Sequence, residues 1–107
     1  MEKPVLIYCP FPDREAALSV AKRLVEEKLV ACVNILPGMM SVYMWQGQVE
    51  SSDEIIALFK TCSSLKDKAG EAIRKLHPYE VPVIVYLATE GAEEGTMAWI
   101  MREIGGW

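Results

Sequence analysis

The first strong signal for the fold is the stretch Val5-Leu6-Ile7-Tyr8-Cys9, which is followed by Pro10-Phe11-Pro12 and Asp13. Five apolar residues, rich in β-branched and aromatic side chains, predict a central strand over residues 5–9, and the two prolines end it. Asp13 is typical of a helix N-cap. Beyond it, one helical face is formed by Ala17, Val20, Ala21, Leu24 and Val25. The spacing predicts an amphipathic helix over residues 13–28.

The next segment predicts a long hairpin. Residues 29–35 and 39–45 have the character of one strand, which Pro37-Gly38 interrupts as a bulge or bend would. Gln46-Gly47 predicts a tight turn, because glycine accepts a positive φ. Residues 48–61 then return as a third strand.

The remainder predicts a helix, a strand and a short helix. Ser63 or Ser64 is expected to cap the second helix. Its apolar face is expected to be Leu65, Ala69, Ala72, Ile73 and Leu76. Gly70 weakens this helix by about 1 kcal/mol relative to alanine. Residues 81–87 predict a fourth strand, and residues 90–95 form a polar loop. The terminal helix has an apolar side of Met97, Ile100, Met101 and Ile104, and Gly105-Gly106 stops it.

This order of elements, β-α-β-β-α-β with a terminal helix, predicts an α+β fold of the ferredoxin-like, split βαβ type. We expect one domain over residues 1–107, with an antiparallel sheet. The first strand should lie between the third and fourth, with the second at an edge. Both main helices should cover the same sheet face.

Net charge, hydropathy and cysteine content indicate which partners and which cellular compartment to expect. The net charge is −4, with the basic residues spread along both helices, which argues against nucleic acid or an anionic membrane as a partner. We see no apolar run near the ~20 residues of a membrane span, and no signal-peptide pattern. Three widely spaced cysteines favour a reducing compartment over a disulfide framework. We therefore expect a cytoplasmic protein.

Apolar residues on both faces of the sheet predict self-association. Residues 55–59 are apolar at five consecutive positions, and residues 83–87 repeat the pattern. Because strand side chains alternate between faces, both faces are apolar, yet two helices cover only one. The hairpin over residues 39–50 should also extend beyond the helices. A homo-oligomer whose sheet faces pack together, and whose hairpins reach neighbouring chains, accounts for both features.

Topology brings Cys9, His77 and the carboxylates Asp53 and Glu54 to one edge of the sheet. A thiolate with an imidazole suits copper or zinc, and the nearby start of the first helix could favour the thiolate. The alternative is structural: a buried cysteine that packs as a small hydrophobe, and a histidine that closes a backbone hydrogen bond. We find no third residue that would orient a Cys9–His77 nucleophile and base.

Several segments together form a specific combination. They are Pro12-Asp13, residues 28–35 (KLVACVNI), Pro37-Gly38, residues 41–47 (SVYMWQG), Lys60-Thr61, residues 77–82 (HPYEVP) and Trp99. In these the chain resembles the CutA divalent-cation-tolerance family along nearly its whole length. The resemblance implies a stable, cytoplasmic homotrimer, similar in fold and assembly to PII signalling proteins, and linked to tolerance of divalent metals.

The resemblance also implies copper ligands. A thiol at the end of the first strand maps to Cys9, and the histidine of the His-Pro-Tyr segment maps to His77. Some members carry His-His-Pro-Tyr, where this chain has Leu76, and members commonly have a tyrosine where this chain has Thr96. The chain therefore lacks one candidate ligand, which argues against strong copper binding.

We expect a non-enzymatic, trimeric protein that binds Cu²⁺ weakly through Cys9, His77 and Glu54. Two other functions remain open. One is a PII-like signalling trimer that binds a small molecule in clefts between subunits, lined by Tyr43, Trp45, Lys60 and Tyr79. The other is a scaffolding trimer that docks another protein through the hairpin.

Overall fold

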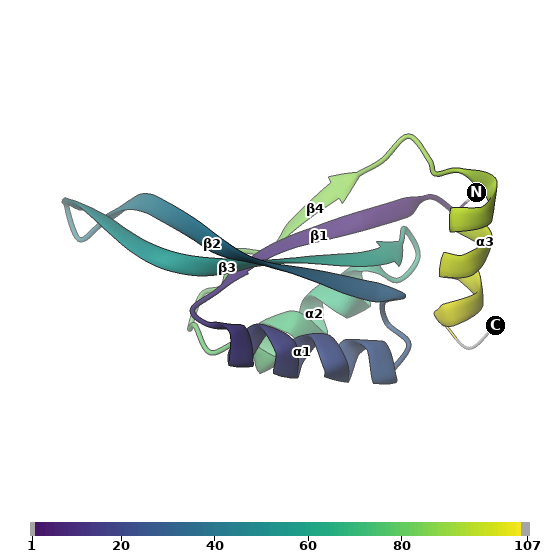
Figure 1. Cartoon of the computed structure of the whole chain (residues 1–107), viewed down its shortest axis with the longest axis horizontal. Coiled ribbons are helices and arrows are strands. Elements are labelled where there is room, and N and C mark those ends of the chain that lie inside the picture. Colours follow the sequence, from purple (N-terminus) through teal and green to yellow (C-terminus); the bar gives the residue numbers. More distant parts are fainter. Residues whose placement is uncertain (1, 106–107) are drawn as a thin grey trace.

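The computed structural model describes residues 2–105 and confirms the α+β architecture (Figure 1). The elements are β1 (Pro4–Phe11), α1 (Arg14–Glu26), β2 (Cys32–Trp45), β3 (Gln48–Cys62), α2 (Lys66–Leu76), β4 (Val85–Ala88) and α3 (Glu94–Glu103). The four strands form one antiparallel sheet in the order β2-β3-β1-β4. β1 therefore lies between β3 and β4, as predicted.

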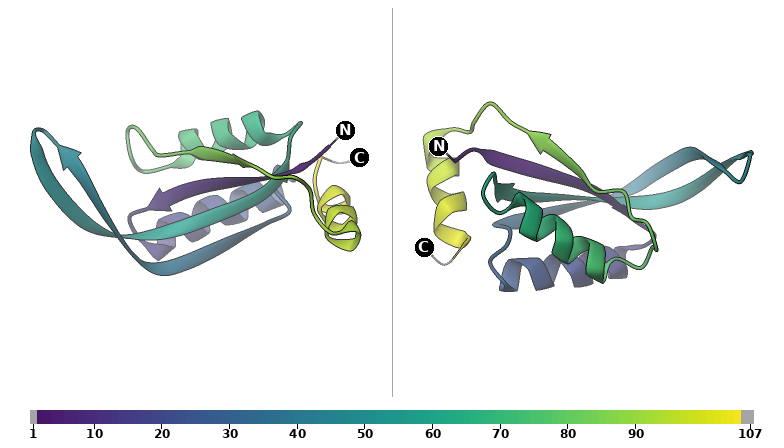
Figure 2. Two further views of the ribbon diagram at one scale, coloured as in Figure 1. Left: turned by 90° about the horizontal axis from the view of Figure 1, so that it is seen from above. Right: turned by 180° about the vertical axis from the view of Figure 1, so that it is seen from behind.

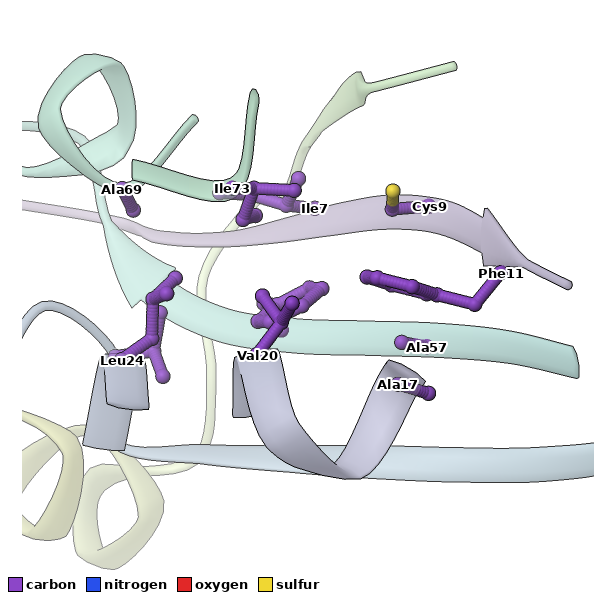
Figure 3. Packing of buried hydrophobic residues seen from close by; sticks show 11 residues of the cluster. Ile7, Cys9, Phe11, Ala17, Val20, Leu24, Ala57, Ala69 and Ile73 are labelled. Atoms are coloured by element: carbon purple, nitrogen blue, oxygen red, sulfur yellow. The ribbon is translucent and has the colours of Figure 1, made fainter. Parts of the chain in front are cut away.

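Helices α1 and α2 lie side by side against one face of the sheet (Figure 1; Figure 2, right). On β1, Ile7, Cys9 and Phe11 are fully buried beneath them, and they meet Val20 and Leu24 of α1 in one core cluster (Figure 3). The alternation of buried and less buried residues along β1 follows from the two-residue period of a strand.

Helix α1 begins as predicted and ends earlier. The Asp13 side chain accepts a hydrogen bond from the Ala16 amide at 2.8 Å, which confirms the N-cap. The helix ends at Glu26 rather than at residue 28, because Lys28 adopts a left-handed φ of 60°. Strand β1, in turn, continues through the predicted proline stop to Phe11 by pairing with β3.

The β2–β3 hairpin has the predicted bulge and turn. The register shifts between Leu36 and Met39, on either side of Pro37-Gly38. Gln46 and Gly47 both have positive φ, 48° and 81°, as a two-residue turn between strands of natural twist requires. Beyond the helices the hairpin projects alone (Figure 1). Its exposed apolar side chains are Met40, Val42, Tyr43, Met44, Trp45 and Val49.

Helix α2 departs from the prediction at both ends. Leu65, not Ser63 or Ser64, is the N-cap residue, and it makes no side-chain capping bond. Ser63 and Ser64 instead donate hydrogen bonds to Glu2. The Glu2 carboxylate accepts from the Ser63 hydroxyl at 2.8 Å and from the Ser64 amide at 3.1 Å. Leu76, expected on the buried face, is 38% exposed.

Gly70 disfavours the helix but is needed for packing between α2 and β4. The residue is buried in α2, facing Tyr86 of β4. A Cβ at this position would meet the Tyr86 hydroxyl and would lie 2.8 Å from its Cζ atom. Lys66 lies over the same ring, 5.0 Å from its centroid. The missing side chain is therefore what lets Tyr86 pack on α2.

Strand β4 is shorter than predicted. It covers Val85–Ala88, and residues 81–84 do not join the sheet. Its pairing with β1 stops at Tyr8↔Val85. An antiparallel pair exchanges two N–H···O bonds, and Pro10, two residues further along β1, has no N–H to contribute. The apolar run therefore predicted strand pairing wrongly over residues 81–84, and much of it is exposed in the single chain: Val81 is 84% and Val83 53% exposed.

The terminal helix α3 packs at the end of the sheet, where Ile100 and Ile104 are buried against Ala31, Cys62 and Leu65. Gly105 has a φ of 73°, in keeping with the predicted stop, whereas Gly106 lies outside the described residues.

The second face of the sheet is apolar, and α1 and α2 lie on the opposite side of it (Figure 1). Helix α3 meets β3 at the end of the sheet, where Cys62 is buried. We call it the outer sheet face. Its apolar residues, which alternate with the buried ones along each strand, are Leu6, Tyr8, Leu36, Ile56, Leu58, Val85 and Leu87. Leu36, Val85 and Leu87 are 46%, 42% and 41% exposed.

Candidate functional site

The end of β1 is where the predicted site residues meet. Cys9 lies opposite Ala57 of β3, three residues from Glu54. His77 follows α2 directly, and its ring reaches the backbone of Pro10. Cys32 and Cys62 lie near the other end of the strands. One chain therefore brings Cys9, His77 and Glu54 into the same corner.

Both ring nitrogens of His77 have backbone partners. Nε2 lies 2.7 Å from the Pro10 carbonyl oxygen, and Nδ1 accepts from the Tyr79 amide at 3.1 Å. Because a carbonyl can only accept, Nε2 carries the proton, and because an amide N–H donates, Nδ1 does not. The geometry therefore selects one neutral tautomer. The ring also stacks on Phe11, with centroids 4.3 Å apart.

The surroundings of Cys9 and His77 keep the thiol and the imidazole uncharged. Burial lowers the pKa of His77, while the Pro10 carbonyl and the charge of Glu54 oppose that shift. Burial, assisted by Glu54, raises the pKa of Cys9 to about 12. This outweighs any help that the positive end of α1 gives to a thiolate. At neutral pH the site therefore holds a thiol and an uncharged imidazole.

Glu54 is engaged by Tyr79. The Tyr79 hydroxyl donates to Glu54 Oε2 at 2.8 Å. Burial, then this hydrogen bond and the nearby negative charge, raise the pKa of Tyr79 to about 12. Tyr79 also packs against the His77 ring, with centroids 4.8 Å apart. The carboxylate thus forms part of a network that runs from β1 through His77 and Tyr79 to β3.

These residues do not fit a resident copper ion as they stand. The metal ligand is the thiolate rather than the thiol, and a ligating imidazole needs a free lone pair on one nitrogen. Cys9 is protonated and fully buried, and His77 has both nitrogens in use. In the part of the chain from 2 to 105, no three His, Cys, Asp or Glu side chains are grouped as a metal site.

The residues predicted to line a cleft are spread out within one chain: three lie along the β2–β3 hairpin, and Tyr79 lies in the connection between α2 and β4. Trp45 is at the tip beside Gln48, whereas Lys60 pairs with Cys32 near the far end of β3. A cleft containing all four needs a neighbouring chain.

Sequence reasoning missed two partners of this corner, the Pro10 carbonyl and the Phe11 ring. A signal for the first was present: a proline in a strand cannot complete a pair with its neighbour, so its carbonyl needs another donor.

Comparison with known proteins decides the family. Residues 5–103 match the family model described as CutA1 divalent ion tolerance protein. The chain belongs to this family. A CutA divalent-cation tolerance protein of Thermus thermophilus is 43% identical over 105 residues, which are 98% of this chain and 100% of that protein. Its counterpart in Pyrococcus horikoshii is 36% identical over 99 residues, 92% of this chain and 96% of that one.

Solved CutA structures share the fold. The structure of CutA from Xylella fastidiosa aligns with a TM-score of 0.93 at 35% identity, and covers 96% of this chain and 99% of its own. The Thermus thermophilus structure gives 0.90 at 40% identity, and covers 98% and 100%. The α+β arrangement with a four-stranded antiparallel sheet is therefore that of CutA1 proteins.

The names of relatives point to more than one location. A CutA of Arabidopsis thaliana, of which this chain spans 53%, is called chloroplastic, and that of Archaeoglobus fulgidus is called periplasmic. Between residues 2 and 105, this chain has no helix with the length and apolar character needed to cross a membrane.

Proposed function

We propose that this CutA1 protein is a non-enzymatic homotrimer that contributes to tolerance of divalent cations in the cytoplasm. The observation that supports it best is the outer sheet face, apolar on all four strands and left open by the helices. Fully burying one large apolar side chain is worth about 1.5–3 kcal/mol, so a face with seven apolar side chains favours association.

The hairpin supports an assembly rather than a monomer. A two-stranded hairpin is marginal by itself in water, and Met44, Trp45 and Val49 near its tip are 65%, 58% and 69% exposed. Packing against a neighbouring chain buries these side chains and brings Tyr79 of one subunit toward Trp45 or Lys60 of another. The free cysteines among the described residues support a reducing, cytoplasmic location.

The state of Cys9 and His77 supports a non-enzymatic role. The Cys9 thiol has a raised pKa and the His77 imidazole is tied to the backbone, so neither group is prepared for nucleophilic or base chemistry. Copper binding through Cys9, His77 and Glu54 would be weak for the same reason, because each side chain would have to give up its present state.

Two experiments test these proposals. A strain without the gene is grown in rising Cu²⁺, Zn²⁺ or Cd²⁺, with and without the wild-type gene restored. We expect restored growth at toxic concentrations, and equal growth of both strains would contradict the tolerance role. Separately, Cu²⁺ is titrated by calorimetry and electron paramagnetic resonance into wild type, Cys9→Ser and His77→Ala. We expect weak binding that both substitutions reduce. Identical curves would remove Cys9 and His77 as ligands.

A further inference from the structure

At the end of β1, the Pro10 carbonyl has no backbone hydrogen-bond partner within the sheet. β4 begins only at Val85, the partner of Tyr8, so Cys9–Phe11 have no strand on that side. Pro10 is buried, and without His77 its carbonyl would keep only a weak donor, the Cys9 thiol at 3.7 Å. Buried carbonyls are almost always paired, since losing water without a replacement donor is unfavourable.

His77 supplies the missing donor from a distance of 67 residues in sequence. Its other nitrogen accepts from the amide of Tyr79, two residues further on, as an Asn or Asp side chain does in a turn. The ring stacks on Phe11 and also packs against Tyr79. The imidazole is thus held by two hydrogen bonds and two aromatic contacts.

These contacts fix the position of Tyr79. With its amide held by Nδ1 and its ring against the imidazole, Tyr79 reaches Glu54, whose partner on β2 is Met39, the first residue after the bulge. The pairing of β3 with β1 ends at Ile55, so Glu54 lies where the hairpin continues without β1 beside it.

We infer that His77 is a conformational lock: its neutral Nε2–H tautomer replaces the missing strand at Pro10 and positions Tyr79 on Glu54 at the base of the hairpin. The lock ties three segments together, the end of β1, the connection between α2 and β4, and β3. It also makes metal ligation by His77 and the native contacts of His77 mutually exclusive, because each ring nitrogen is already used.

This inference concerns contacts within one chain and does not depend on the proposed function. Its most direct test is the tautomer. His77 is the only histidine, so ¹⁵N-labelled histidine gives one set of ring signals in the intact protein. We expect the proton on Nε2 and an unprotonated Nδ1 at pH 8. A proton on Nδ1, or the averaged signals of a free imidazole, would overturn the lock.

The second test separates the two hydrogen bonds by substitution. His77→Asn keeps an acceptor for the Tyr79 amide but is too short to reach Pro10, whereas His77→Phe keeps the aromatic stacking and loses both bonds. We expect hydrogen exchange at the Tyr79 amide to stay within about threefold of wild type in the asparagine variant and to rise at least tenfold in the phenylalanine variant.

Tyr79→Phe is the matched control. It removes only the hydroxyl that reaches Glu54, so the amide should keep its protection. Far-ultraviolet circular dichroism and molar mass check that all variants keep the wild-type fold and assembly. If His77→Phe keeps that fold and its Tyr79 amide exchanges as slowly as in wild type, the lock is wrong. A His77→Phe protein that fails to fold leaves the tautomer measurement to decide.

Discussion

Removing one leucine from the outer sheet face should weaken the assembly by a measurable amount. Leu87 of β4 is 41% exposed in the single chain. Fully burying a leucine is worth about 1.5–3 kcal/mol, so burying the remaining two fifths is worth about 0.6–1.2 kcal/mol per chain. Three copies give about 2–4 kcal/mol per trimer, which corresponds to a roughly 30- to 1000-fold weaker association constant for Leu87→Ala.

Leu76→Ala is the matched control, since Leu76 is 38% exposed but belongs to α2, on the opposite side of the sheet. Sedimentation velocity over a dilution series measures the concentration at which half of the chains are monomeric. For a trimer this midpoint follows the square root of the constant, so we expect a shift of roughly 5- to 30-fold for Leu87→Ala and none for Leu76→Ala.

If the wild-type trimer does not dissociate at measurable concentrations, a fixed guanidinium concentration below the unfolding transition brings it into range. Equal midpoints for Leu87→Ala and Leu76→Ala would refute the assignment of the outer sheet face as the contact surface.

Three further predictions concern the single chain. Gly70→Ala should destabilise wild type, yet stabilise a Tyr86→Ala background by about 1 kcal/mol, because only the tyrosine opposes the gain in helix propensity. Asp13→Ala should lower the free energy of unfolding by about 1 kcal/mol through loss of the α1 cap, and Asp13→Asn should restore most of it. Glu2→Gln should be less stable than wild type at pH 7, because the Ser63 and Ser64 hydrogen bonds lower the pKa of Glu2 to about 2. Since the folded pKa lies below the ordinary value of 4.5, this difference is full above pH 4.5 and is lost as the pH falls toward 2.

Urea unfolding at one fixed chain concentration measures all three, because the stability of an oligomer depends on concentration. A Gly70→Ala effect of the same size in both backgrounds would show that Tyr86 is not the obstacle. An Asp13→Ala protein as stable as wild type would mean that the cap contributes nothing. A Glu2→Gln difference that persists unchanged at pH 2 would contradict a contribution from the ionised carboxylate.

Local chemistry made most of the fold predictable. The apolar spacing of α1, the Asp13 cap, the bulge at Pro37-Gly38 and the turn at Gln46-Gly47 each follow from neighbours in sequence. The order of strands then follows from the order of elements.

The elements that were predicted wrongly depend on distant residues. Residues 81–84 read as a strand, but Pro10 on the adjacent strand cannot complete the pairing. Ser63 and Ser64 read as caps, but Glu2 takes up their donors. Sequence neighbours carry no information about either partner.

In the candidate site, too, the positions of the residues could be predicted from the sequence and their hydrogen-bond partners could not. Strand order and direction were enough to place Cys9, His77 and Glu54 in one corner. They were not enough to reveal the hydrogen-bond partners, and these partners give the corner its chemistry. The Pro10 carbonyl and the Tyr79 amide turn a candidate metal ligand into a residue held by the backbone, and burial keeps the Cys9 thiol protonated.

Multi-angle light scattering on the purified protein tests the central claim, that copies of this chain bury the outer sheet face of one another. The chain has a mass of 12.0 kDa, so three copies give about 36 kDa. We expect a single species of that mass at micromolar chain concentration. A folded particle of one chain mass, stable at the same concentration, would show that the apolar face needs no partner and would contradict the trimer.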